Sequence, residues 1–148
     1  MKSVIQRVKK ASVTINGKEK RTIAEGLVVL AAFGKNDTAR KCAILFEKIK
    51  NMRIFSNEEG KFDKSVEDIK GSFLIISQFT LYGNCKKGKR PDFTEAAGYE
   101  QGKKLYEEFL ETAKQSGINV VSGEFGADML VDIQNDGPVT IILDSENI

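Results

Sequence analysis

The sequence predicts an α/β fold that is rich in mixed β-sheet, contains two main helices and occupies residues 1–148 as a single domain. Two apolar runs bounded by glycine, at residues 26–34 and 71–83, are typical of buried strands. Two amphipathic stretches, at residues 36–52 and 94–117, have the periodicity of helices. Because these segments alternate with further β-prone stretches, their order favours one mixed α/β domain.

The chain is expected to begin with a β-hairpin. Residues 2–17 are β-prone and end in Asn16–Gly17, a strong two-residue hairpin signal. Residues 20–25 would form the return strand, and the first buried strand follows directly at residues 26–34.

The first helix is expected over residues 36–52, with Asp37 or Thr38 as its N-cap. Four apolar residues lie on one stripe of this helix: Cys42, Leu45, Ile49 and Met52. Cys42 is therefore interpreted as a core residue, because a free cysteine packs as a small hydrophobe. A loop-rich segment follows at residues 53–71, and its acidic residues lack the spacing of a calcium-binding EF-hand.

A second buried strand, at residues 71–83, precedes a basic loop at residues 85–93 and then the second helix. Three apolar residues share one stripe of that helix: Leu105, Phe109 and Ala113. Gly117 fits its C-terminal stop. Residues 119–145 are expected to form two or three strands, with Asp136–Gly137 marking the last turn.

The composition excludes several kinds of catalytic site. The chain has no histidine, so it cannot form a Ser-His-Asp triad, a Cys-His pair or an HExxH zinc site. An enzyme with this sequence would use carboxylates, backbone N–H groups, hydroxyls, lysines or groups of its own substrate. Two cysteines, Cys42 and Cys85, suit a reducing cytosol and are too few for a metal or disulfide framework. We therefore expect neither a metal nor a cofactor.

Charge and hydropathy limit the partners. The net charge of +2 is too small to indicate nucleic-acid binding by itself, so any basic surface must be local. No apolar run approaches the roughly 20 residues that a membrane-spanning helix needs, and the N-terminal segment lacks the features of a signal peptide. A cytoplasmic location without a membrane partner is expected.

Polar residues end the second buried strand, at Ser77–Thr80. Strand alternation would place Gln78 and Thr80 on one face with Leu74 and Ile76. Ligands of α/β proteins often lie at such carboxyl ends. An ordinary strand end that meets solvent has the same pattern, so the pattern alone leaves both interpretations open.

The basic loop also has two interpretations. Four cations surround one glycine there: Lys86, Lys87, Lys89 and Arg90. Such a loop beside a cleft could bind phosphates, or it could be a solvated run of charges.

Pro138 lies between an Asn-Asp-Gly turn signal and a β-prone run, in the sequence NDGPVT at residues 135–140. It could be the first residue of a strand, where proline's missing N–H is tolerated. It could instead form a cis Gly-Pro turn, because an X-Pro bond prefers the trans form by only about 0.5–1 kcal/mol.

Five segments together resemble the D-aminoacyl-tRNA deacylase family, in order and at family-like spacing. They lie at residues 1–17, 77–81 (SQFTL), 87–93 (KGKRPDF), 125–129 (FGADM) and 135–140. The resemblance implies the fold of that family. It also implies a homodimeric cytoplasmic enzyme that hydrolyses the ester between a D-amino acid and the terminal ribose of tRNA. The family also removes glycine from mischarged tRNA.

The resemblance further implies roles for individual residues. The catalytic set would be Ser77, Gln78, Phe79 and Thr80, in which the backbone N–H near Phe79 donates to the oxyanion. The 2′-hydroxyl of the RNA would help to activate water. Thr80 ranks lower as a nucleophile, because no adjacent base or N-terminal amine is evident.

Substrate binding is implied for Arg7, Phe125, Met129, Gly137, Pro138, Val139 and Thr140. A cis Gly137–Pro138 bond from one subunit would project into the partner's site and exclude the side chain of an L-amino acid by steric clash. Contact with tRNA is expected for Lys86, Lys87, Lys89 and Arg90.

Two alternatives remain open on the sequence. One is an amidase or esterase that acts on free D-amino acid derivatives, with Thr80 as its nucleophile. The other is a non-catalytic RNA- or nucleotide-binding module that uses the basic loop.

Overall fold

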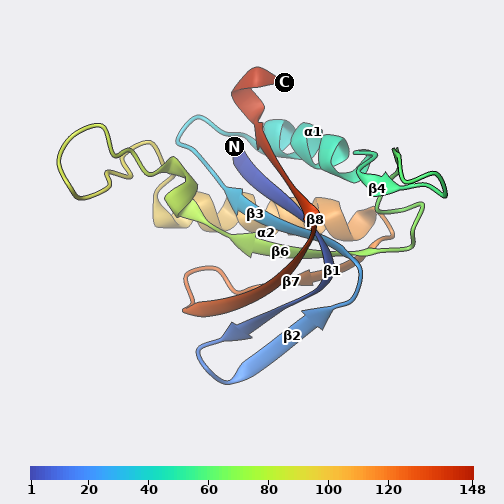
Figure 1. Cartoon of the computed structure of the whole chain (residues 1–148). Helices are drawn as coiled ribbons and strands as arrows, with labels where there is room; N and C mark the ends of the chain where they lie inside the picture. Colours follow the sequence, from blue (N-terminus) through green and yellow to red (C-terminus); the bar gives the residue numbers. More distant parts are fainter.

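The computed structural model describes all of residues 1–148, and its elements follow in the order shown in Figure 1. The strands are β1 (Lys2–Ile15), β2 (Glu19–Ile23), β3 (Gly26–Ala32), β4 (Phe55–Ser56), β5 (Phe62–Lys64), β6 (Ser72–Ser77), β7 (Asn119–Ser122) and β8 (Met129–Asp144). The helices are α1 (Ala39–Lys50) and α2 (Tyr99–Gln115), with short 3₁₀ turns η1 (Phe79–Tyr82) and η2 (Ser145–Asn147). The α/β fold with two main helices is therefore confirmed.

The main sheet is mixed, as the sequence predicts. Its order is β2-β1-β3-β6-β7, and β8 pairs with β1. The pairs of β1 with β2, β3 and β8 are antiparallel, whereas β3–β6 and β6–β7 are parallel. The N-terminal part of β1 pairs with β3 and its C-terminal part with β2, so β8 runs along the opposite edge of β1 throughout.

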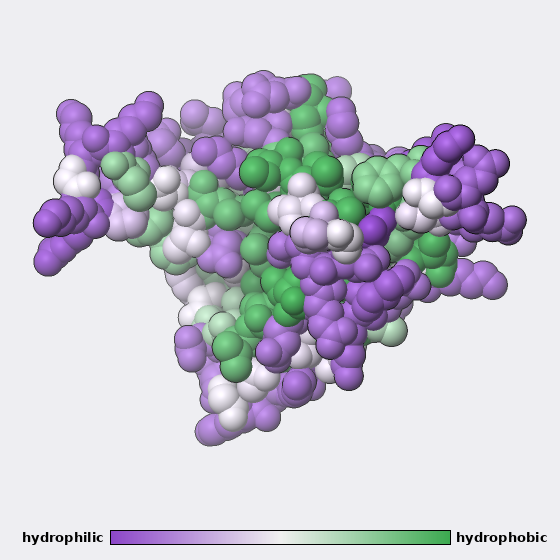
Figure 2. Space-filling view, in the orientation of Figure 1, coloured by the Kyte–Doolittle hydropathy of each residue, from purple (hydrophilic) through white to green (hydrophobic).

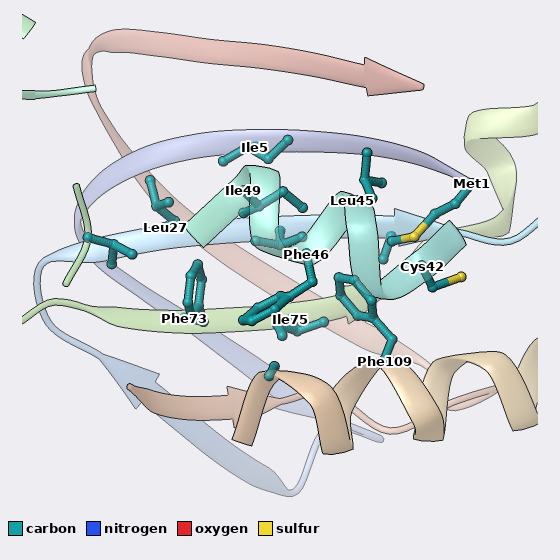
Figure 3. Close-up of a cluster of buried hydrophobic side chains, with 14 of the residues drawn as sticks. Met1, Ile5, Leu27, Cys42, Leu45, Phe46, Ile49, Phe73, Ile75 and Phe109 are labelled. Carbon is teal, nitrogen blue, oxygen red and sulfur yellow. The ribbon is translucent and has the colours of Figure 1, made fainter. Parts of the chain in front are cut away.

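Apolar side chains are buried on both faces of this sheet. The larger cluster lies between the sheet and the two helices, and Figure 3 shows Phe46 of α1 and Phe109 of α2 beside the strand residues Phe73 and Ile75. A second cluster lies on the other face: Val8, Ala11, Val13, Ile15, Ile23, Val28, Leu74 and Ile76. Because β3 and β6 bury side chains in both directions, their sequences are continuously apolar.

The predicted helical stripes are confirmed, with shifts at the ends. Cys42 is buried in the core, and this burial raises the pKa of its thiol to about 12, so the thiol stays protonated. Thr38 is the N-cap of α1, whereas Met52 lies beyond its C-cap, Asn51. The N-terminal boundary predicted for the second helix is wrong, because α2 begins only at Tyr99.

Two predicted strand boundaries are also wrong. The strand predicted over residues 71–83 ends at Ser77, and η1 follows it. The turn predicted at Asp136–Gly137 does not end a strand, because β8 continues through it to Asp144. Pairing with β1 on both sides of this dipeptide maintains the strand, and the dipeptide forms a bulge instead.

Asp37 anchors the chain termini rather than capping α1. Its carboxylate accepts hydrogen bonds from the Met1 ammonium group, from Ser145 and from the backbone N–H of Gly34. Met1 and Asp37 are almost fully buried, so this ion pair is screened from water. Neither helix combines the length and apolar character of a membrane-spanning helix.

Candidate active site

A cavity of about 540 Å³ opens where β6 ends, between η1, the start of α2 and the segment before β8. Eleven residues line it: Ile76, Ser77, Gln78, Phe79, Ala97, Tyr99, Phe125, Gly126, Ala127, Met129 and Val131. Five of the residues implied by the family resemblance are among them. Most of the lining is apolar, with the polar groups concentrated at the end of β6. Such a cavity suits an organic ligand that a few polar groups orient.

Backbone geometry at the end of β6 creates the polar part of the cavity. The N–H of Gln78 still donates to the carbonyl of Ala31, 2.8 Å away, as in the parallel ladder. The chain then turns, and the N–H groups of Leu81 and Gly83 donate to the carbonyls of Gln78 and Thr80. The first N–H groups of a helical turn have no acceptor inside it. Phe79 begins η1 and lines the cavity, so its N–H is available to an oxygen atom of a ligand.

Gln78 and Thr80 are neighbours, but not for the reason predicted. Strand alternation cannot place them together, because the strand ends before both. The turn of η1 brings the Gln78 Nε2 within 2.5 Å of the Thr80 Oγ1, to which it donates a hydrogen bond. An amide cannot remove a proton from a hydroxyl, so this contact positions Thr80 without activating it.

The apolar wall of the cavity is built from aromatic and small residues. The Phe125 ring meets the rings of Tyr99 and Tyr106 at centroid distances of 5.4 and 5.7 Å. Gly102 of α2 makes room for it, since a Cβ there would lie 3.2 Å from the Phe125 ring. In the same way, a Cβ on Gly123 would lie 2.5 Å from the Met129 sulfur. The side chains of Phe125 and Met129 thus occupy space that is available only because Gly102 and Gly123 have no Cβ.

Tyr99 was missed by reasoning from the sequence. Tyr99 is 60% exposed and lines the cavity, whereas the other aromatic residues of α2, Tyr106 and Phe109, are buried. The sequence places it inside a longer predicted helix and gives no signal that it faces a cavity. Only the observed start of α2, one residue after Gly98, puts it there.

Residues 136–139 form a bulge in β8. Thr140 pairs with Gln6 and Asn135 with Val8, so four residues of β8 stand opposite the single residue Arg7. The Asn135 side chain closes the bulge by accepting from the Val139 N–H and donating to the Thr140 hydroxyl. Within the bulge, the peptide bond between Gly137 and Pro138 is cis.

Arg7 supports the bulge from inside the fold. This residue is 8% exposed, and its guanidinium donates to the carbonyls of Ile54 and Asp136 at 2.7 and 3.3 Å. Gly137 has φ +118°, and a Cβ there would lie 3.0 Å from the Arg7 Nη2. The close approach and the backbone angle both require glycine at this position.

The predicted site residues therefore fall into separate groups within one chain. Neither Arg7 nor any residue of 137–140 lines the cavity. Val139 packs in the main core, and the hydroxyl of Thr140 is used to close the bulge. Thr80 also lies outside the lining, beside Gln78.

The basic loop projects from the body of the molecule next to η1 (Figure 1). Its ends are joined by hydrogen bonds between Asn84 and Asp92, and hydrophilic side chains cover this end of the molecule (Figure 2). All four cations are exposed and none forms an ion pair: Lys86, Lys87, Lys89 and Arg90. Their charges are free to meet an anionic partner.

Comparison with known proteins gives matches over the whole chain. Residues 4–144 match the family model described as D-Tyr-tRNA(Tyr) deacylase. The chain is 51% identical over 146 residues to a D-aminoacyl-tRNA deacylase of Clostridium novyi (strain NT), which covers 99% of this chain and 98% of that protein. It is 49% identical over 148 residues to the D-aminoacyl-tRNA deacylase of Thermotoga petrophila, covering 100% of this chain and 99% of that one.

Two solved structures have the same fold. One is described as the c-Myc DNA unwinding element binding protein, with a TM-score of 0.90, 43% identity and coverage of 97% of this chain and 98% of that chain. The other is described as a probable eukaryotic D-amino acid tRNA deacylase, with a TM-score of 0.84 and 18% identity, covering 96% and 97%. At that identity the second match speaks for the fold alone.

Proposed function

Because the chain belongs to the D-Tyr-tRNA(Tyr) deacylase family, we propose that it removes D-amino acids from tRNA by hydrolysing their ester bond to the terminal ribose. The family and the full-length relatives make it a D-aminoacyl-tRNA deacylase, a hydrolase of an ester bond. The finer parts of the proposal are rejection of L-aminoacyl-tRNA, removal of mischarged glycine and assistance by the RNA itself. The observation that carries the hydrolysis is the cavity, which is lined by apolar residues and by Phe79, the first residue of η1. The observation that carries the rejection of L-aminoacyl-tRNA is the bulge with the cis Gly137–Pro138 bond.

The proposed reaction needs no histidine. Water attacks the ester carbonyl carbon, and the carbonyl oxygen takes up negative charge that the Phe79 N–H stabilises by a hydrogen bond. The C–O bond to the ribose then breaks, and the ribose oxygen leaves and takes up a proton. The 2′-hydroxyl of the same ribose assists removal of the proton from water. Gln78 and Ser77 line the cavity at this end and help to hold the ester.

Chiral rejection is proposed to come from a second copy of the chain. The Gly137–Pro138 bulge does not line the cavity of its own subunit, so it can act on a substrate only in a partner's cavity. There its carbonyl oxygens would clash with an L side chain, whereas a D side chain or the hydrogen of glycine would avoid them. The hydrogen bonds of Arg7 would hold the bulge in place, so that its carbonyl groups do not move away from an L side chain.

Strand β8 offers a surface for this homodimer. It pairs only with β1, so its other edge has free backbone groups. Leu130 and Ile142 of β8 are 67% and 75% exposed. An apolar band follows β8 across this face (Figures 1 and 2). Exposed apolar surface of this kind is typical of an interface.

The first test separates an editing enzyme from the two alternatives. We expect the purified protein to hydrolyse D-tyrosyl-tRNA and to leave a small ester such as D-tyrosine ethyl ester nearly untouched, because the latter has no 2′-hydroxyl. Rapid turnover of the small ester would favour a free D-amino acid esterase. Binding of tRNA without loss of the ester would favour a non-catalytic module.

Thr80→Ala is expected to keep deacylation within about tenfold of wild type. The reason is that the Thr80 hydroxyl contacts only an amide, whereas removing a true nucleophile costs on the order of a millionfold. Single-turnover hydrolysis of D-tyrosyl-tRNA measures the effect. A covalent aminoacyl adduct on Thr80, trapped in the wild-type protein and seen by mass spectrometry, would contradict the proposal.

Reversing two charges in the basic loop is expected to weaken tRNA binding without unfolding the protein. In Lys86→Glu with Lys89→Glu, each lost phosphate contact should lower the slope of log affinity against log salt by about 0.7. The matched control is Lys61→Glu with Lys64→Glu, in and next to β5 at the other end of the molecule. Equal affinity and slope in both double variants would show that the loop is only a solvated run of charges.

A second candidate function rests on one comparison. One similar structure is described as a DNA unwinding element binding protein. The second candidate function is therefore binding of DNA by the same exposed cations. Titration of the wild-type protein and of the Lys86→Glu with Lys89→Glu variant with single-stranded DNA, at the salt concentrations used for tRNA, tests it.

A further inference from the structure

We propose that Phe62 is a positioning residue for chiral discrimination, which acts by holding Arg7 beneath the Gly137–Pro138 bulge. This inference rests on the proposed function and extends it to a hairpin that does not line the cavity. The hairpin consists of β4 and β5, which form a separate small two-stranded sheet.

Phe62 is an unusual surface residue. It is 55% exposed and belongs to neither apolar core. Its ring instead faces the guanidinium group of Arg7, at 5.4 Å from the ring centroid. A cation within about 6 Å of a ring face is attracted by the negative charge of that face. The contact therefore accounts for an exposed aromatic side chain on β5, whereas Phe55 of β4 is buried in the main core.

The same hairpin holds Arg7 from a second direction. Ile54 directly precedes β4, and its carbonyl accepts from the Arg7 Nη1 at 2.7 Å. Phe62 pairs with Ser56 across the hairpin, so the ring and the Ile54 carbonyl belong to one local unit. Between them they fix the plane and the depth of the guanidinium group.

The guanidinium group contacts the bulge through its remaining nitrogen atoms, Nε and Nη2. Arg7 Nε donates to the carbonyl of Asp136, and its Nη2 lies close to the Cα of Gly137, as the 3.0 Å approach to a Cβ built there shows. A guanidinium group is planar and rigid, so tilting it at one side displaces it at the others. Loss of the Phe62 ring should therefore loosen the bulge while leaving the cavity intact.

The test compares three substitutions of Phe62 with one control. Values of kcat/KM are measured for D-tyrosyl-tRNA and L-tyrosyl-tRNA. For Phe62→Ala and Phe62→Leu, the D-to-L ratio should fall roughly threefold to tenfold, the size expected for loss of a cation–π contact. Phe62→Tyr keeps an aromatic ring and should retain the wild-type ratio. Ile44→Ala removes a similarly exposed apolar side chain, 51% exposed on α1, and should also retain it.

The pattern across variants distinguishes positioning from mere packing. Leucine restores apolar volume but not the ring, so rescue by tyrosine and not by leucine supports the inference. An unchanged ratio in Phe62→Ala, equal rescue by leucine, or conversion of the variant to a monomer in size-exclusion chromatography would overturn it. A wild-type protein without activity on D-tyrosyl-tRNA would refute the proposed function itself, and this inference with it.

Discussion

Replacing Gly137 by alanine is expected to lower the D-to-L ratio of deacylation by roughly tenfold to a hundredfold. Gly137 has φ +118°, where an alanine is strained by about 1–3 kcal/mol. Its Cβ would also lie 2.8 Å from the Val139 Cγ2 and 3.0 Å from the Arg7 Nη2. Both effects displace the carbonyl groups of the bulge, so L-tyrosyl-tRNA should be hydrolysed more readily relative to D-tyrosyl-tRNA.

A second glycine provides the matched control. Gly17, in the β1–β2 turn, also has a positive φ, of +67°, but a Cβ there would meet no atom within 4 Å. Gly17→Ala should therefore introduce a strained positive φ without a steric clash and keep a wild-type D-to-L ratio. Folding of both variants is checked by circular dichroism. A folded Gly137→Ala protein with wild-type rates on both esters would mean that the bulge takes no part in discrimination.

Asp37→Asn is expected to destabilise the protein by about 3 kcal/mol. The substitution leaves the Met1 ammonium group buried without its counter-charge, and breaking a buried ion pair from one side typically destabilises by about 3–5 kcal/mol. The lower value is expected because asparagine can still accept the hydrogen bond from the Gly34 N–H. Equilibrium unfolding in urea measures the change.

Asp63→Asn is the control for this prediction. Asp63 pairs with Arg53 on the surface, where both side chains are well exposed. The free energy of unfolding should therefore fall by less than about 1 kcal/mol. Equal decreases in the free energy of unfolding of the two variants would show that the buried Met1–Asp37 pair stabilises the protein no more than an exposed pair.

Much of the fold could be predicted from local patterns. The continuous apolar runs predict β3 and β6, and the helical stripes predict α1 and α2, because each pattern reflects burial against a neighbouring layer. The Asn16–Gly17 turn is confirmed with positive φ at both residues. Each of these features can be predicted from the order of apolar or turn residues within one segment.

The errors occur where distant contacts decide the local structure. Asp136–Gly137 has the sequence of a turn, but β1 pairs with β8 on both sides of it, so the chain bulges and continues. Residues before Tyr99 look helical, yet the N–H of Ala97 donates to the carbonyl of Phe33, and this contact with a distant segment replaces the helical hydrogen bond. Single-sequence patterns cannot show which distant strand supplies such partners.

Only part of the candidate site could be predicted, because the rest depends on contacts that the sequence of one chain does not show. Ser77, Gln78, Phe79, Phe125 and Met129 come together as the resemblance implies. The role of Gly137–Pro138 stays a prediction, because one chain alone keeps the bulge away from the cavity. Only a second subunit could unite them, and a single sequence gives no geometry for that contact.

We propose above that this protein hydrolyses the ester between a D-amino acid and tRNA and leaves the L ester intact. The direct measurement is the loss of ester from one tRNA charged separately with D-tyrosine and with L-tyrosine, at equal protein concentration. We predict loss of the D ester at least about a hundredfold faster than loss of the L ester, whose decay should match that without protein. Equal rates for the two esters, or no loss of the D ester, would contradict this proposed function.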